Sequence, residues 1–365
     1  MVNTKHRVIK TNEFVFFLGL ILLEVRFFMV NLELVRYLSP ILDLSTTLIF
    51  LICILIKMQK KELTRGNFVR MIIVIALGLL SLAITKKPFV LKTGLIILSA
   101  EGIRFKTIIR TDLFIKTSIL ISVMLLYFSG IINTSFTSVR GEILRNSWGF
   151  RHPNTLGLIL TIIFFELSYL YGKGRNVWKI ILSVMFIAFI YLVPNSRSPL
   201  YVIVFYLVIS FLKNKVNESF LNKIIFRKNL LFMLFSAVSI IMVFLYTNSP
   251  VIINIDTGIM SNRIYYQKLA FENTGLSLLG KNISENTILD NSYIYVLLGY
   301  GVSIYYFYYS IYKKLFNSIM DDKQIELLII IVSILLYGVF ENSLTNIICN
   351  LFVLYPFCSK ELKHA

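Results

Sequence analysis

Long apolar runs alternate with short polar connections along almost the whole chain. A helix needs about 20 apolar residues to span a bilayer, and the runs approach that length, although several are shorter. We therefore expect an all-α, polytopic integral membrane protein with about 12 transmembrane helices, folded as a single membrane domain over residues 1–365. The expected spans lie near residues 14–30, 41–56, 70–84, 89–101, 113–131, 153–170, 178–193, 199–212, 229–246, 292–311, 325–340 and 344–358.

Composition agrees with this pattern. The 365 residues are 57% apolar and only 15% charged, and the mean hydropathy is +0.76, which is far from that of an ordinary soluble domain. The three cysteines lie in apolar runs without paired spacing, which indicates small buried side chains and neither a disulfide framework nor a metal site. We expect no metal and no cofactor.

The basic residues indicate the topology. A formal net charge of +18 is compatible with nucleic-acid binding, but the Lys and Arg residues alternate with the spans and form no single basic face. With a cytoplasmic N-terminus, 24 of the 37 Lys and Arg residues lie on the cytoplasmic side, ten outside and three within spans. Cytoplasmic loops are enriched in these residues. Both termini are therefore expected in the cytoplasm, with membrane lipid and not nucleic acid as a partner; Lys86 and Lys87 are the exceptions on the outer side.

Two connections on the expected outer side are longer than a turn. They cover residues 131–152 and 247–291, and loops of the second length are usually functional or disordered. The second connection contains aliphatic and aromatic residues, which favours a segment that packs on the membrane domain. We expect a short amphipathic helix near residues 261–272.

Polar residues precede three spans that run inward from the outer side. Arg151 and His152 stand directly before Pro153, and Pro suits the first position of a helix. Arg197 stands beside Pro199 at the start of another span, with Ser198 as a plausible N-cap. Asp290, Asn291 or Ser292 could cap a third. Helix N-termini and guanidinium groups both attract phosphate, so this pattern predicts an anion site on the outer side.

Each of these features also has a simpler explanation. Arg151 and His152 are typical of a water interface, and Arg197 lies in a segment rich in turn-forming residues. Glu341 is either an N-cap of the last helix or a base or substrate ligand near the hydrocarbon boundary. For Asp290 the capping role is favoured. The sequence has no GxxxxGK[ST], HExxH or GxSxG motif, so ATP-driven transport, zinc hydrolysis and serine-hydrolase chemistry have no support.

Four stretches in order resemble the Wzy-type polysaccharide polymerases of bacterial capsule, exopolysaccharide and O-antigen assembly. They are RNSWGFRHPNTLG (145–157), NSRSPL (195–200), the segment 262–301 and YGVFENSLTN (337–346). The resemblance implies a multi-span, GT-C-like glycosyltransferase in the bacterial cytoplasmic membrane. Such an enzyme transfers a growing glycan from undecaprenyl diphosphate to a sugar hydroxyl of the next lipid-linked repeat unit, on the outer face.

The resemblance gives the polar residues expected roles. Cations on the diphosphate stabilise the leaving group, and a base accepts the proton of the acceptor hydroxyl. Undecaprenyl-diphosphate-linked repeat units are the expected ligands, with a chain-length regulator and a flippase as further partners. The expected diphosphate ligands are Arg145, Arg151, Arg197 and Arg263, the expected catalytic residues are His152 and Glu341, and the expected substrate-binding residues are Asn154, Asn195, Asp290, Asn291 and Tyr265.

Two alternatives stay open from the sequence. An O-antigen-ligase-like transferase uses the same donor and passes the glycan to another acceptor. A flippase or permease for lipid-linked oligosaccharide belongs to a different class, and it is expected to carry charged residues deep in several spans. Most of the polar residues noted above lie instead at the outer ends of spans, which favours a transferase.

Overall fold

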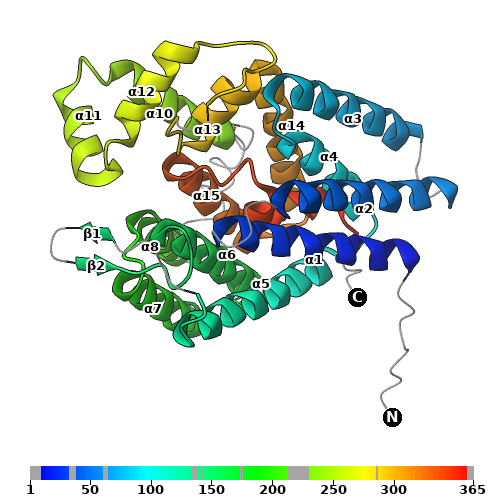
Figure 1. The fold of residues 1–365 in the computed structure, drawn as a ribbon, viewed down its shortest axis with the longest axis horizontal. Coiled ribbons are helices and arrows are strands. Elements are labelled where there is room, and N and C mark those ends of the chain that lie inside the picture. The colour runs from blue at the N-terminus through cyan, green and yellow to red at the C-terminus, as the bar shows by residue number, and fades with distance from the viewer. Residues whose placement is uncertain are drawn as a thin grey trace.

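The chain folds almost entirely into helices (Figure 1). The computed structural model describes residues 10–32, 38–60, 65–132, 138–140, 143–172, 174, 176–212, 230–284 and 287–359. The two termini and the basic connection 213–228 of the expected topology lie outside these residues, as do parts of the connections 31–40, 57–70, 131–152, 172–179 and 247–291.

Between residues 10 and 212, the described part of the chain contains eight α-helices. They are α1 (Thr11–Asn31), α2 (Ser39–Gln59), α3 (Arg65–Thr85), α4 (Phe89–Ala100), α5 (Phe105–Phe128), α6 (Pro153–Tyr171), α7 (Asn176–Leu192) and α8 (Arg197–Leu212).

The second half contains shorter and irregular helices as well as long ones. They are α10 (Leu231–Leu245), α11 (Pro250–Ile255), the π-helix η3 (Asp256–Met260), α12 (Arg263–Thr274), α13 (Ser292–Tyr295), the π-helix η4 (Val296–Tyr300), α14 (Gly301–Asp321), α15 (Ile325–Phe340) and the 3₁₀-helix η5 (Ile347–Phe357).

Several helices are suited to a bilayer. Within the described residues, five are long and apolar enough to cross it, namely α2, most of α3, α5, α6 and the continuous α13–η4–α14 segment. A sixth is possible if α10 and the α11–η3 segment form one span, although they are bent by 111° relative to each other. The prediction of an all-α membrane protein is therefore confirmed. A helix lies in each of the twelve apolar runs, but the count of twelve spans and the GT-C-like architecture stay predictions.

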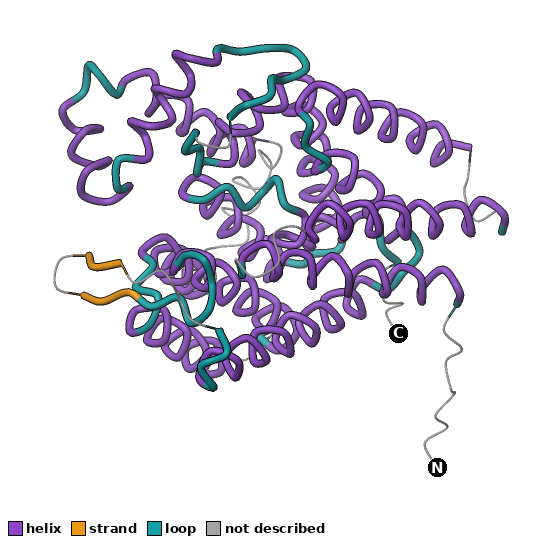
Figure 2. Tube along the Cα trace, in the orientation of Figure 1, coloured by secondary structure: helices purple, strands orange, loops and turns teal. Residues whose placement is uncertain are grey.

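The two long connections are not simple loops. The first contains an antiparallel ribbon of β1 (Ser138–Arg140) and β2 (Ile143–Arg145), drawn in orange in Figure 2. An all-α prediction did not include these strands. The second contains α11, η3 and α12, and α12 lies where a short amphipathic helix was expected. One face of α12 buries Ile264, Gln267 and Ala270.

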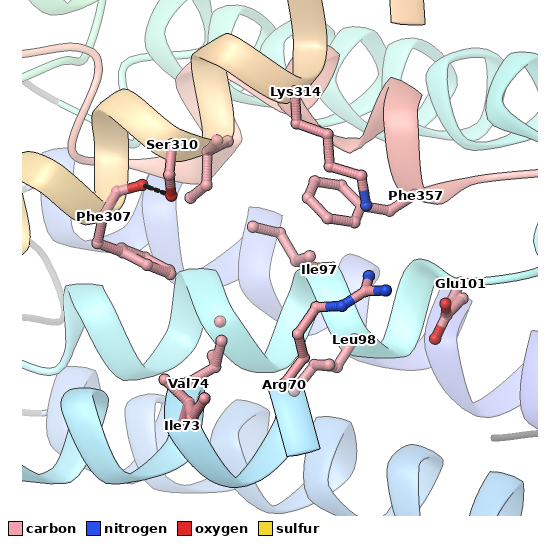
Figure 3. A pocket seen from close by; sticks show the side chains of 12 residues that line it. Arg70, Ile73, Val74, Ile97, Leu98, Glu101, Phe307, Ser310, Lys314 and Phe357 are labelled. Atoms are coloured by element: carbon pink, nitrogen blue, oxygen red, sulfur yellow. Dashed lines mark hydrogen bonds between the residues drawn. The ribbon is translucent and has the colours of Figure 1, made fainter. Parts of the chain in front are cut away.

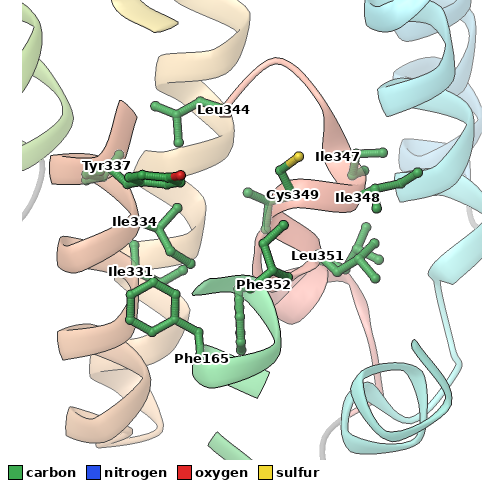
Figure 4. Close-up of a cluster of buried hydrophobic side chains, with 14 of the residues drawn as sticks. Phe165, Ile331, Ile334, Tyr337, Leu344, Ile347, Ile348, Cys349, Leu351 and Phe352 are labelled. Carbon is green, nitrogen blue, oxygen red and sulfur yellow. The ribbon is translucent and has the colours of Figure 1, made fainter. Parts of the chain in front are cut away.

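The core is one continuous cluster of apolar side chains contributed by helices from α1 to η5. Its centre is formed by α6, α15 and η5, where Phe165, Ile334 and Phe352 pack together (Figure 4). Because η5 and the connection before it are surrounded by other helices, the backbone that leaves α15 at Glu341 lies against the core and is not a free surface loop.

Helix ends that are distant in sequence meet at one end of the bundle. The backbone N–H of Arg151 donates to the carbonyl of Asn31 at 2.8 Å, and that of Asn146 donates to Val193 at 3.0 Å. These bonds join the beginning of α6 to the ends of α1 and α7. We call this end, which also holds Arg263, the Arg263 end.

Further helix termini meet at the opposite end. Lys57 Nζ, at the end of α2, donates to the carbonyl of Ser99 at 2.6 Å, near the end of α4. Arg104, before α5, pairs with Ser359, after η5. This distribution matches the alternation of spans that the charge pattern predicts. The orientation of the two ends relative to the membrane stays a prediction.

Candidate functional site

A partly buried ion pair lies at the Arg263 end. Arg263 is the first residue of α12, and Glu341 directly follows α15. Arg263 Nη2 lies 2.8 Å from Glu341 Oε1, and the two side chains are only 12% and 14% exposed. A charge-assisted hydrogen bond in such a position is stronger than one in water. The pair therefore fixes α12 against the end of α15.

Arg263 has further partners on three other segments. Its Nε lies 3.1 Å from Asp290 Oδ2, and its Nη1 donates to Ser198 Oγ at 3.3 Å and to the carbonyl of Phe340. The guanidinium group is thus held by two carboxylates, a hydroxyl and a backbone carbonyl. Its position is determined by the ends of α8 and α15 and by the segment before α13.

Glu341 is the acceptor at the centre of this network. Ser198 Oγ donates to its Oε1 at 3.2 Å, and Asn154 Nδ2 donates to the same atom at 3.4 Å. Ser292 Oγ donates to the backbone carbonyl of Glu341 at 2.8 Å and accepts the N–H of Ser343 at 3.0 Å. Glu341 is therefore a shared ligand of the first turns of α6, α8 and α13, and not an N-cap satisfied within its own loop.

The environment raises the pKa of both Glu341 and Arg263. Burial raises the pKa of the Glu341 carboxyl above its ordinary value, and the adjacent Arg263 offsets only part of that shift. Burial acts to lower the pKa of Arg263, but the Glu341 and Asp290 carboxylates outweigh it and raise that pKa. The site therefore holds a permanently charged cation beside a carboxyl with increased proton affinity.

Arg145 contacts the pair of Arg263 and Glu341 indirectly, through Asn154. Its Nη2 donates to Asn154 Oδ1 at 2.6 Å, and its Nε donates to the carbonyl of Pro194 at 3.1 Å. Ser196 Oγ also donates to Asn154 Oδ1, at 3.1 Å. Because Arg145 is only 4% exposed, its contacts position Asn154, which in turn donates to Glu341.

A narrow cleft opens beside the pair. Arg197 stands at its edge, where Nη1 donates to the carbonyl of Gly258 at 2.9 Å. Arg197 and Arg263, the first residues of α8 and α12, both line this cleft. The cleft is lined by Asn154, Arg197, Ser198, Ile259, Met260, Ser261, Arg263 and Phe340.

Side chains of the protein already occupy two of the three helix N-termini that were expected to attract an anion. His152 caps α6, where its Nδ1 accepts the N–H of Asn154 at 3.0 Å. Asn291 caps α13 by accepting the N–H groups of Tyr293 and Ile294 at 2.9 and 3.1 Å. Capping satisfies donors that an anion would otherwise bind. The cap at α13 is therefore one of the three that the sequence offered, Asn291, whereas the cap of α6 by His152 was not expected.

The N-terminus of α12 is occupied in the same way. The Asp256 carboxylate accepts the N–H of Ile264 at 2.9 Å and that of Tyr265 at 3.0 Å. At this helix the Arg263 side chain, and not the backbone, is the group that could bind an anion.

The remaining predicted residues have other surroundings. Arg151 is exposed. Asn195 adopts a left-handed turn with φ 42°, and its side chain donates to the carbonyl of Tyr191 at 3.1 Å. Tyr265 is 47% exposed and its ring lies 6.0 Å from that of Tyr246. Asn195 thus shapes the turn before α8, and roles for Arg151 and Tyr265 in ligand binding stay predictions.

Sequence reasoning missed the part played by three serines. Ser196, Ser198 and Ser292 all donate to members of the network. Ser198 was expected to cap α8, but that helix begins one residue earlier, at Arg197, and the hydroxyl turns to Glu341. The signal in the sequence is their position: Ser196 and Ser198 flank Arg197, and Ser292 lies two residues after Asp290.

A second polar cluster lies within the helical bundle. Lys116 Nζ lies 2.5 Å from Asp112 Oδ2, 2.8 Å from Glu166 Oε1 and 3.6 Å from Glu24 Oε1. These four side chains, from α1, α5 and α6, are at most 1% exposed. The contact of Lys116 with Glu24 joins α5 to α1, and that with Glu166 joins α5 to α6.

The chain has no match among family models, curated proteins or solved structures. Across the described ranges, no group of three or more His, Cys, Asp or Glu side chains is arranged to hold a metal ion. Metal-independent chemistry stays a prediction.

Proposed function

We propose that the protein is a membrane-embedded glycosyltransferase that uses a lipid-diphosphate-linked glycan as donor, and that it polymerises repeat units. The observation that carries the proposal is the contact of Arg263 with Glu341 beside the cleft that Arg197 also lines. A cation suited to diphosphate and a carboxyl suited to proton transfer stand next to each other. The family resemblance supplies the substrate class.

In this proposal the arginines act on the leaving group. Arg197 and Arg263 bind the diphosphate at the cleft, which has a volume of about 10 Å³ and widens as the ligand enters. There they stabilise the negative charge that develops as the bond from the anomeric carbon to the diphosphate oxygen breaks. The acceptor hydroxyl forms a new bond to the same carbon and gives its proton to Glu341. The products are the elongated glycan on the acceptor's lipid and free undecaprenyl diphosphate.

In this proposal, the contacts of Arg263 mean that donor binding precedes proton transfer to Glu341. Its guanidinium is fully engaged with Glu341, Asp290 and neighbouring groups. A diphosphate that binds Arg263 therefore competes with the Glu341 carboxylate and weakens its strongest contact. Donor binding in this way releases Glu341 to accept a proton.

One observation favours the flippase or permease alternative. The cluster of Lys116 with Glu24, Asp112 and Glu166 is charged and lies deep in the helices, and buried charges within membrane helices often mark transport paths. A transporter moves labelled lipid-linked units across proteoliposomes without lengthening them, whereas a polymerase lengthens them. An O-antigen-ligase-like enzyme transfers the glycan to a different acceptor.

The experiment compares variants of the purified protein in proteoliposomes. The substrates are lipid-linked repeat units extracted from cells that lack the protein, and chain length is measured by gel electrophoresis and mass spectrometry. We expect the wild type to produce a ladder, with Arg263→Ala and Glu341→Gln slower by about 10²-fold or more. Matched controls are Arg110→Ala and Glu272→Gln, both exposed, which should retain wild-type rates. Normal ladders from Arg263→Ala and Glu341→Gln would exclude the proposed site.

A further inference from the structure

A second cavity lies away from the candidate functional site. It has a volume of about 420 Å³ and is bordered by α3, α4, α14 and η5 near the opposite end of the bundle (Figure 3). This volume falls in the range of small-molecule binding sites. The lining residues are Arg70, Ile73, Val74, Gly94, Ile97, Leu98, Glu101, Phe307, Ser310, Ile311, Lys314 and Phe357.

The walls of the cavity are mainly aliphatic and aromatic. Ser310, one of the few polar lining residues, donates its hydroxyl to the carbonyl of Phe307 within its own helix at 2.7 Å. The hydroxyl proton is therefore not available to a ligand. A wall of this kind suits a hydrocarbon chain.

Two cations border this apolar space from opposite walls. Arg70 extends from α3 and Lys314 from α14 (Figure 3). Lys314 Nζ lies 4.0 Å from the centre of the Phe357 ring, which is a cation–π contact. Glu101 is the one carboxylate among the residues that line the cavity. With one carboxylate against two cations, the lining carries a net positive charge that an anion would neutralise.

We infer that this cavity binds an anionic phospholipid. An acyl chain lies along Ile73, Ile97 and Phe307, and the headgroup phosphate contacts Arg70 and Lys314. The predicted topology places this end in the cytoplasmic leaflet, where anionic lipids attract basic residues. The site is distant from Arg263 and Glu341 and does not depend on the proposed function.

The experiment measures lipid retained by the full chain after release from nanodiscs that contain equal amounts of phosphatidylglycerol and phosphatidylcholine, by native mass spectrometry. We expect the wild type to retain phosphatidylglycerol preferentially. Replacement of the two cations, Arg70→Gln with Lys314→Gln, should lower that preference by about fivefold for each cation removed. The matched control, Arg110→Gln with Lys313→Gln, removes two exposed cations that do not line the cavity, and it should keep the wild-type preference.

A second variant tests the apolar part without a change of charge. Ile97→Trp fills the cavity and should reduce the retention of both lipids, with circular dichroism and size-exclusion chromatography used to verify folding. Equal retention of the two lipids by the wild type would overturn the inference. The inference would also be overturned if the variant without Arg70 and Lys314 retained as much phosphatidylglycerol as the control variant. Full retention of lipid by a folded Ile97→Trp protein would overturn it too.

Discussion

Arg263 Nη2 lies 2.8 Å from Glu341 Oε1, although the two residues are 78 positions apart in the chain. This contact joins a short helix from the long connection 247–291 to the end of a central helix of the core. The connection is therefore part of the candidate site. The geometry of that site depends on an electrostatic contact as well as on apolar packing.

Loss of the cation alone should destabilise the protein. Arg263→Ala leaves Glu341 and Asp290 beside each other without a counter-charge, and we expect a loss of about 3 kcal/mol in the free energy of unfolding. The double variant Arg263→Met with Glu341→Gln removes both charges and should recover most of that stability while it stays inactive. Thermal unfolding in detergent measures both effects. Equal destabilisation by the single and double variants would show that packing, and not charge, explains the effect.

The pH dependence of elongation should report Glu341. A base works only when deprotonated, so activity rises with pH through the pKa of Glu341, which burial raises above 4.5. The Asp290 carboxylate also raises this pKa, and Asp290→Asn should therefore move the acid limb of the pH–rate profile to lower pH. Glu272→Gln, on the same helix as Arg263 but 57% exposed at its carboxyl side chain, should leave the limb in place. A limb that moves upward in Asp290→Asn would contradict this assignment.

The stability of the protein should depend on Lys116, the single cation of the buried cluster. Lys116→Met keeps the length of the side chain but leaves Glu24, Asp112 and Glu166 without a counter-charge, and the expected cost is about 3–5 kcal/mol. Lys313→Met, at an exposed position of α14, is the control and should change stability by less than about 0.5 kcal/mol. Chemical or thermal unfolding compares the two. A Lys116→Met protein as stable as the control would mean that the three carboxyls are neutral without the lysine.

Close packing of α6 against the beginning of α8 should tolerate no added methyl group. A Cβ at Gly157 would lie 2.9 Å from Ser196 Cβ and 3.0 Å from Pro199 Cγ. We expect Gly157→Ala to cost about 1–3 kcal/mol and to slow elongation, because Ser196 and Ser198 are displaced with the turn. Gly258 has open space around it, so Gly258→Ala should be neutral in the same assays.

The helices were predictable because long apolar runs leave the backbone little alternative in a membrane. Pro153 does begin α6, and the charge alternation correctly grouped the helix ends that meet near Asn31 and Arg151. The ribbon at 138–145 carries no comparable signal. The 111° bend after α10 does coincide with a local one, since Ser249 caps α11 and Pro250 is its first residue.

The candidate site was predictable in part. Arginines beside helix beginnings pointed to the end of the molecule at which Arg263 and Glu341 meet, but the sequence gives no rule that pairs these two residues across 78 positions. Asn291 was among the expected caps of α13 and does cap it. The cap of α6 by His152 was missed, because the sequence placed this residue only in a ligand or interface role. The spacing of Asp112 and Lys116 by four residues was a usable signal for the buried cluster.

The release of undecaprenyl diphosphate tests the central claim most directly. Purified protein is incubated with lipid-linked repeat units, and the undecaprenyl diphosphate released is counted against the glycosidic bonds formed. We predict one molecule released for each bond in the wild type, and neither release nor bond formation above background with Glu341→Gln. Elongation without release of the lipid diphosphate, or equal release by wild type and Glu341→Gln, would contradict the account.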